Sequence, residues 1–232
     1  MLRSLVGSEM CIRDRKKGRE MDFLQKLPHF DYFCNHDHHP NGRIFVLWKR
    51  SEIKISFPFV SSQIIHCNVT TPNGSTFMIS FVYGHNDLTM RKPLWDELDM
   101  LSRPHIPWIC MGDWNTVLSP EDRRSNFPFK PRDCEDFRDC LTRNDLVVLP
   151  TVGLKYTWYN QQNPPNHVWA ILDRAIANIK WRDTYRFESN ILHPGPSDHS
   201  PCFIKLFDIP NKRARTFRFL NTWCHHPRLS TS

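Results

Sequence analysis

The sequence contains no apolar run that approaches the ~20 residues a membrane-spanning helix needs. Internal repeats and low-complexity segments are also missing. Glycine is scarce, with 8 residues against 18 prolines, a balance that indicates many loops and strand ends. A hydrophobic content of 40% with 8 tryptophans argues against disorder, so we expect a folded chain that does not enter a membrane.

The eight cysteines include no Cys-x-x-Cys pair, and residues 1–15 lack the apolar stretch of a secretory signal. Cys110 and Cys202 fall in apolar, strand-like runs. We therefore expect reduced, buried thiols in a nuclear or cytoplasmic protein that is not secreted.

The formal net charge of +7 comes from the two ends of the chain. Residues 1–20 carry 6 basic and 3 acidic side chains, and residues 211–232 carry 5 basic and no acidic ones. The part between them has 20 basic and 21 acidic residues. The basic character is therefore poor support for a basic binding face on the folded body.

At 232 residues the chain can bury one substantial core, and we expect one monomeric domain. Residues 1–15 show no periodicity and look like translated sequencing-adapter read-through, so we expect a non-native leader there. The predicted domain covers residues 16–208, and residues 209–232 form a basic linker or tail.

Hydrophobic patterning predicts more strands than helices. Strand-like runs occur at residues 30–34, 44–48, 53–57, 63–70, 76–83, 107–111, 146–149, 156–159, 168–173, 186–192 and 201–207. Helical spacing occurs at residues 19–27, 94–101, 132–143 and, as one turn, 177–182. This alternation predicts a layered α/β or α+β sandwich.

Two local patterns invite specific interpretations. Asn73-Gly74 between β-rich runs predicts a hairpin with a type I′ turn. The run Cys34-x-His36-x-His38-His39 suggests zinc, but it has no second ligand pair at finger-like spacing. A turn at residues 40–42 adjoins it, so a surface loop is the better interpretation, and the sequence does not say whether the cluster binds anything.

The segment most suggestive of chemistry is Gly112-Asp113-Trp114-Asn115, which follows a predicted buried strand. If the backbone stays extended there, the side chains of Asp113 and Asn115 leave on the same face. A carboxylate and a carboxamide at the end of a central strand suit metal-assisted or water-activating chemistry. A polar turn in which both side chains bond the local backbone is an equally good explanation of this pattern alone.

Further polar residues stand at or beside the ends of other predicted strands. A sheet gathers such ends along one edge, where a binding site can form. Each also has a structural alternative: Tyr83 as a core-edge aromatic, Asp173 as an ion-pair partner near Arg174, and Ser197-Asp198 as a turn or cap. The residues in question are Tyr83, Asn86, Asp113, Asn115, Asp173, Asp198 and His199.

Taken together, these segments resemble the endonuclease/exonuclease/phosphatase superfamily, and more narrowly the endonuclease domain of plant LINE-type (non-LTR) retrotransposons. The similarity covers roughly residues 18–207. Residues 216–227 resemble the linker that leads toward a reverse transcriptase in such elements. The matching segments are GRIFVLWK at 42–49, FVYG at 81–84, PWICMGDWN at 107–115, YTWYN at 156–160, LDRAIAN at 172–178 and SDHSP at 197–201.

The resemblance implies a DNase I-like four-layer α/β sandwich that hydrolyses phosphodiesters, in DNA for the parent family, with Mg²⁺ or Mn²⁺. It implies that Asp113 orients or deprotonates the attacking water and also binds the metal, and that Asn115 holds the phosphate or the water. His199 would bind the phosphate, with Asp173 fixing and charging its ring. Tyr83 and Asn86 would position the phosphate, and Asp198 would be a metal ligand.

Two departures from the family pattern predict impaired catalysis. The family begins with a strand bearing an Asn and a second strand ending in a metal-binding Glu, and neither precedes the predicted helix at residues 19–27. The family also commonly has Arg where this chain has Ile171. We thus expect an N-terminally incomplete phosphodiesterase domain, with exposed strand edges. The alternatives are a catalytically dead relic that binds nucleic acid weakly, and a phosphatase acting on phosphoinositides or small phosphoesters.

Overall fold

The computed structural model describes residues 27–207. Three predicted segments lie outside this range: the leader at residues 1–15, the helix at residues 19–27 except for its last residue, and the tail at residues 209–232. In chain order the elements are β1 (Phe30–Cys34), β2 (Phe45–Lys49), β3 (Lys54–Val60), β4 (Ile64–Thr70), β5 (Thr76–Tyr83), α2 (Leu88–Leu101), β6 (Trp108–Asp113), a 3-10 turn η1 (Pro120–Asp122), β7 (Arg123–Ser125), α3 (Arg132–Arg143), β8 (Leu146–Val148), β9 (Val152–Gly153), β10 (Trp158–Tyr159), β11 (Val168–Ala170), β12 (Asp173–Asn178), α4 (Ile179–Thr184), β13 (Arg186–Ile191) and β14 (Cys202–Phe207).

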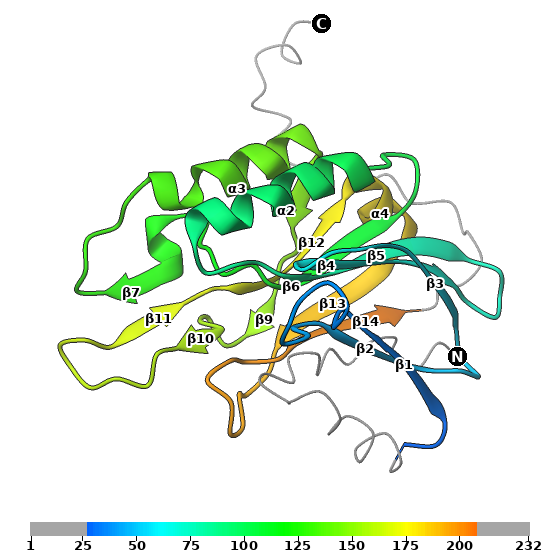
Figure 1. The fold of residues 1–232 in the computed structure, drawn as a ribbon, viewed down its shortest axis with the longest axis horizontal. Helices are drawn as coiled ribbons and strands as arrows, with labels where there is room; N and C mark the ends of the chain where they lie inside the picture. Colours follow the sequence, from blue (N-terminus) through cyan, green and yellow to red (C-terminus); the bar gives the residue numbers. More distant parts are fainter. Residues whose placement is uncertain (1–26, 208–232) are drawn as a thin grey trace, which may run out of the picture.

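A six-stranded sheet in the order β3-β4-β5-β6-β12-β8 forms the centre of the molecule. Its neighbours are antiparallel except for β5 and β6, which run parallel. Helices α2 and α3 cover one face of this sheet (Figure 1). The other face packs against a layer made of two separate sheets, β1-β2 and β14-β13-β9 (Figure 1).

The alternation along β5 and β6 explains why this sheet can be covered on both faces. Phe77, Ile79 and Phe81 point to the second strand layer, whereas Met78 and Val82 point to the helices. Such alternation follows from the two-residue period of a strand. Each face therefore has its own apolar core, as the sandwich prediction requires.

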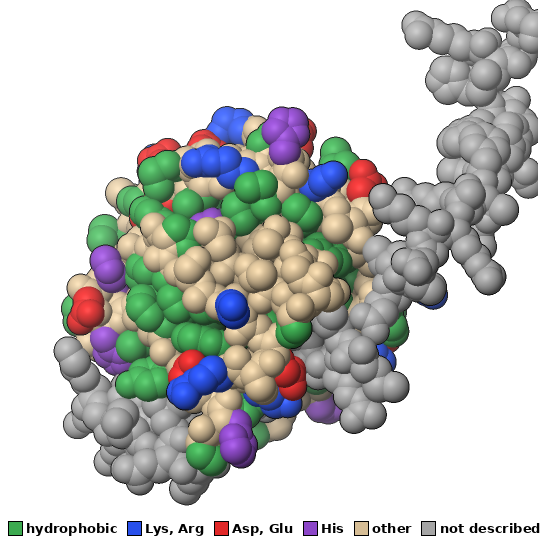
Figure 2. Space-filling view, turned by 90° about the vertical axis from the view of Figure 1, so that its right-hand side faces the viewer, with side chains coloured by type: hydrophobic (Ala, Val, Ile, Leu, Met, Phe, Trp, Pro, Cys, Tyr) green, Lys and Arg blue, Asp and Glu red, His purple; other side chains and the backbone are tan. Residues whose placement is uncertain are grey.

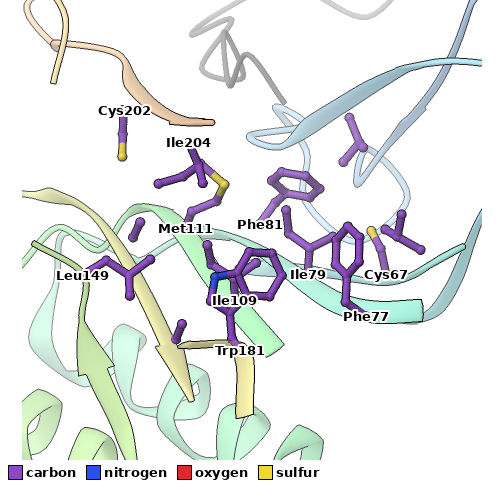
Figure 3. Packing of buried hydrophobic residues seen from close by; sticks show 14 of the residues in the cluster. Cys67, Phe77, Ile79, Phe81, Ile109, Met111, Leu149, Trp181, Cys202 and Ile204 are labelled. Atoms are coloured by element: carbon purple, nitrogen blue, oxygen red, sulfur yellow. The ribbon is translucent and has the colours of Figure 1, made fainter. Parts of the chain in front are cut away.

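The core between the strand layers combines side chains from both of them. Figure 3 shows Cys202 and Ile204 of β14 facing Met111, Phe81 and Ile109 of the central sheet. All five side chains are at most 6% exposed. Burying side chains of this size contributes roughly 1.5–3 kcal/mol each, so this core is a main source of the stability of the fold.

The core under the helices is aromatic. Trp114 packs against Trp95 of α2 and Phe137 of α3, with ring centroids 6.3 Å and 4.8 Å away, and Trp95 and Phe137 also contact each other at 5.1 Å, with all three rings nearly parallel. The predicted inward face of residues 132–143 is confirmed, because Phe137, Cys140 and Leu141 are buried. Helix α2 begins earlier than the apolar stripe suggested, at Leu88, because the Asp87 side chain accepts a hydrogen bond from the Met90 amide.

Two local predictions are wrong. The β4–β5 hairpin exists, but Asn73 is not among the residues with positive φ, so its turn is not type I′. Instead, the Gly74 amide donates to the Thr71 carbonyl and Gly74 alone takes a positive φ of 83°. The single strand expected at residues 168–173 is two strands, because the chain leaves β11 after Ala170 and joins the central sheet at Asp173 as β12.

Two surface properties bear on possible partners. On the face shown in Figure 2, acidic and basic side chains are interspersed without a large patch of one sign, in keeping with the near-neutral body expected from the sequence. Among residues 27–207, no helix has both the length and the hydropathy needed to cross a bilayer.

Candidate active site

Asp113 and Asp173 lie directly opposite each other in the central sheet. Asp113 is the last residue of β6 and Asp173 the first residue of β12, and the antiparallel register pairs them. Tyr83, the last residue of β5, pairs with Asp113 on the other side. Three adjacent strands thus bring three of the predicted residues to one edge, although Asp173 begins its strand instead of ending one as expected.

His199 lies between the two carboxylates. Its Nδ1 atom is 2.7 Å from Asp173 Oδ2, and its Nε2 atom is 4.0 Å from Asp113 Oδ2. Both Asp113 and His199 are buried, at 3% and 6% exposure. Among the described residues, the three side chains are the group whose ligating atoms lie close enough together to hold a metal ion.

Asn115 joins this group through a turn. Its amide donates to Asp113 Oδ1 at 2.9 Å, and its Nδ2 atom donates to Asp113 Oδ2 at 3.2 Å and to the Gly84 carbonyl at 2.7 Å. Of the two alternatives weighed for this segment, the extended backbone is not present, because β6 ends at Asp113 and Asn115 has φ +48°. The polar-turn alternative is therefore present, and the same turn puts the Asn115 side chain onto the Asp113 carboxylate.

Gly112 and Trp114 fix the residues on either side of Asp113. A Cβ atom on Gly112 would lie 2.0 Å from the Val82 carbonyl oxygen, and its φ of +141° suits glycine alone. Trp114 is fully buried, and its Nε1 atom donates to the Arg174 carbonyl at 3.1 Å. Asp113 is consequently fixed on both sides along the chain, by the close contact of Gly112 with β5 and by the buried side chain of Trp114.

Asp198 stands beside the group rather than in it. Its Oδ2 atom accepts a hydrogen bond from Trp158 Nε1 at 3.0 Å, and its carbonyl accepts one from the Tyr159 amide at 3.1 Å. The side chain is half-buried. The Ser197–His199 segment also forms the turn considered as an alternative, since the His199 amide donates to Ser197 Oγ at 3.0 Å. The metal-binding role of Asp198 stays a prediction.

The remaining two predicted residues lie on the rim of the same edge. Tyr83 is half-buried, and the guanidinium of Arg43 lies 5.4 Å from the centre of its ring. Asn86 is exposed in the loop between β5 and α2. Their contact with a phosphate stays a prediction.

Sequence reasoning missed Thr157, which ties three segments of the site together. Its Oγ1 atom accepts hydrogen bonds from the Leu172 and Asp173 amides, each at 2.9 Å, and its carbonyl accepts one from the Ser200 amide at 2.7 Å. A buried Thr in a β-like run carries no signal that separates this role from ordinary packing.

The sequence also left open that Asp173 is an ion-pair partner near Arg174. In the structure Arg174 pairs with a different carboxylate. Arg174 is buried and forms an ion pair with Asp122 at 2.5 Å. Burial lowers the pKa of Arg174, and the nearby Asp122 carboxylate opposes that effect. The carboxylate of Asp173 thus remains directed at His199.

Comparison with known proteins identifies the fold. No family model and no curated protein sequence matches the chain. The endonuclease domain of TRAS1, a telomere-specific non-LTR retrotransposon, matches with a TM-score of 0.61 and 11% identity, over 77% of this chain and 80% of that one. An AP endonuclease from Archaeoglobus fulgidus matches with a TM-score of 0.54 and 16% identity, over 84% and 85%.

The chain has the DNase I-like fold. The fold class predicted from the sequence is thereby confirmed. In the described part of this DNase I-like chain, one layer of helices and two layers of strands are present. The identities are low, so the likeness establishes the fold, and the chemistry has to be argued from the residues at the sheet edge.

Proposed function

We propose that this chain is a divalent-metal-dependent phosphodiesterase domain of the DNA-nicking type, working with an incomplete set of metal ligands. The observation that carries the proposal is the placement of His199 between Asp173 and Asp113 at the end of the central sheet. This arrangement places a carboxylate that can accept a proton within 4.0 Å of an imidazole nitrogen that can donate a hydrogen bond to a phosphoryl oxygen.

Each residue has a definite task in hydrolysis. Asp173, bonded to Nδ1, fixes the His199 ring so that Nε2 faces Asp113 and a phosphate bound there. Nε2 can donate to a phosphoryl oxygen as negative charge develops on it. The Asp113 carboxylate can orient or accept a proton from the attacking water, and Asn115 holds that carboxylate with two hydrogen bonds.

The donor chemistry fits Mg²⁺ or Mn²⁺. Aspartate oxygens are the hard ligands that these cations take, and Asp113 and Asp198 are the residues proposed to hold the ion. When bound, the cation would neutralise charge on the phosphoryl oxygens and the leaving group.

The ligand set also supports the proposal of impairment. Within residues 27–207, no glutamate belongs to the group of potential ligands at the site. A hard cation held by few carboxylates binds weakly. We therefore expect slow turnover that needs a high metal concentration.

The likeness to two endonuclease folds and the basic ends of the chain support DNA as the substrate. Binding that depends on the basic ends should weaken steeply as salt rises, because counterions are released from the phosphates. We propose that the folded body supplies the chemistry and the ends supply most of the affinity.

The test is nicking of supercoiled plasmid by the full chain over a range of Mg²⁺ and Mn²⁺ concentrations. We expect slow nicking whose rate still increases as the metal concentration is raised into the millimolar range. The variant Asp113→Asn, which keeps an acceptor for the Asn115 amide, should lose this nicking. Fast nicking at micromolar metal would contradict the incomplete ligand set. DNA binding without any nicking would favour the relic, and phosphate release from inositol phosphates would favour the phosphatase.

A further inference from the structure

Arg91 is a buried arginine beside the proposed site, and its hydrogen bonds go to main-chain carbonyls. It lies on α2 and is 4% exposed. Its Nη1 atom donates to the His85 carbonyl at 2.8 Å and to the Asn115 carbonyl at 2.6 Å. One guanidinium nitrogen therefore connects the loop after β5 with the loop after β6.

Burying this charge is unfavourable unless something offsets it. Burial lowers the pKa of Arg91, and the carboxylates of Asp133, Asp136, Asp113 and Asp87 counteract that effect. An apolar side chain would brace α2 without such a cost. The presence of an arginine here indicates that its hydrogen bonds to the His85 and Asn115 carbonyls are important.

The Asn115 carbonyl belongs to a residue in an uncommon conformation. Asn115 has φ +48°, in the left-handed region, which is uncommon for residues other than glycine although asparagine adopts it more readily than most. Its side chain bonds Asp113 and the Gly84 carbonyl, so a rotation of this peptide would move the carboxamide off the carboxylate. Arg91 holds the carbonyl end of the same residue.

The packing around Gly84 couples the two loops further. A Cβ atom at Gly84 would lie 2.5 Å from the Trp114 carbonyl oxygen and 3.2 Å from Arg91 Cδ. The arginine stem thus lies beside a point where the two loops are in close contact. Movement of the guanidinium would disturb both loops together.

We propose that Arg91 is a positioning residue that holds Asn115 in the conformation required to orient Asp113. The inference rests on the proposed phosphodiesterase function. It predicts an effect on turnover that passes through Asn115, with little effect on substrate binding.

The first test is a double-mutant cycle on plasmid nicking by the full chain. We expect Arg91→Met to lower kcat about 30-fold with KM changed less than about threefold, and Arg91→Lys to retain more activity because one ammonium can reach a carbonyl. In an Asn115→Ala background, Arg91→Met should lower kcat less than about twofold further. Equal losses in both backgrounds, or a rise in KM alone, would overturn the proposal.

The second test needs no activity. Hydrogen exchange of the Asn115 amide, which donates to Asp113, should become at least about tenfold faster in Arg91→Met and less so in Arg91→Lys. The control is Arg138→Met, because Arg138 also donates to a main-chain carbonyl, that of Leu118 in the same loop, but is exposed and does not bond Asn115. Unchanged exchange would refute the role of Arg91. If the wild type does not nick DNA but the Asn115 amide exchanges faster in Arg91→Met, only the proposed phosphodiesterase function is refuted.

Discussion

The two strand layers of this molecule differ in continuity, and the site draws on both. The central layer is one sheet of six hydrogen-bonded strands, whereas the described strands of the other layer form a pair, β1-β2, and a trio, β14-β13-β9. Asp113 and Asp173 belong to the continuous sheet, and His199 precedes β14 in the divided layer. The carboxylates thus have a rigid support, and the imidazole depends on packing between layers.

This difference suggests that the histidine is the vulnerable member of the site. Asp113 is fixed by strand register on both sides, by Tyr83 of β5 and by Asp173 of β12, and the Asp173 amide is also held by Thr157 Oγ1. His199 is placed by an isolated bridge to Trp158 and by its bond to Asp173. Loosening the divided layer should therefore affect catalysis before it unfolds the chain.

The largest effect expected is on stability, from Ile109→Ala in β6. We expect a loss of about 4 kcal/mol, because a fully enclosed side chain leaves a cavity between strands paired on both sides. The matched change Ile204→Ala in β14, equally buried, should cost about 2 kcal/mol because its layer can relax. Urea denaturation measures both, and equal losses would remove the distinction between the layers.

His66 should make the continuous sheet sensitive to acid. The ring is buried and hydrogen-bonded to Ser80 Oγ at 2.8 Å, and burial, followed by the charge of Arg103, lowers its pKa to about 4. The unfolded chain binds a proton below pH 6.5 while the folded one does not, so stability falls from pH 6.5 to about 4, by on the order of 3 kcal/mol. Denaturation of His66→Asn should show a flatter profile over this range, and an unchanged slope would contradict the assignment.

Asp173→Asn should affect the reaction without affecting the stability of the fold. The variant keeps an oxygen that can accept from His199 but removes the charge, and we expect nicking to fall about 100-fold with the melting temperature nearly unchanged. Asp183→Asn, at an exposed position on α4, is the control and should nick like the parent chain. A normal rate for Asp173→Asn would show that its charge has no part in the reaction.

The smallest effect concerns local opening. Amides of β5 and β6, paired on both sides, should exchange with solvent at least about tenfold more slowly than those of β1, which has the single partner β2 among the described strands. Exchange measured by mass spectrometry on peptides from residues 30–34 and 76–83 would check this. Similar rates would mean that the two layers open as one unit.

The sequence predicted the fold class because strongly patterned segments decided it. Residues 76–83 and 132–143 match β5 and α3 to the residue, since their apolar spacing is clear and their ends carry turn residues. The division of residues 168–173 was missed because Val168 to Asp173 reads as one apolar run, and the change of sheet between Ala170 and Asp173 depends on partners distant in sequence.

The proximity of Asp113, Asp173 and His199 was predictable from strand order and from the resemblance, but the way they are held was not. Thr157 and Arg91 carry no distinguishing pattern, because a threonine in a β-like run and an arginine in a helical run usually face solvent or neighbours. Their roles come from long-range hydrogen bonds to carbonyls and amides that only the folded chain brings together.

Gly112 shows how a residue without a functional group can govern a proposed active centre. Because its α-carbon passes against the Val82 carbonyl, even one added methyl group would push β5 and β6 apart just before Asp113. A mutational screen that scores cleavage alone would therefore rank Gly112 with the acids and bases. Only a parallel measurement of folding yield would reveal that Gly112 contributes by having no side chain where β5 and β6 are in close contact.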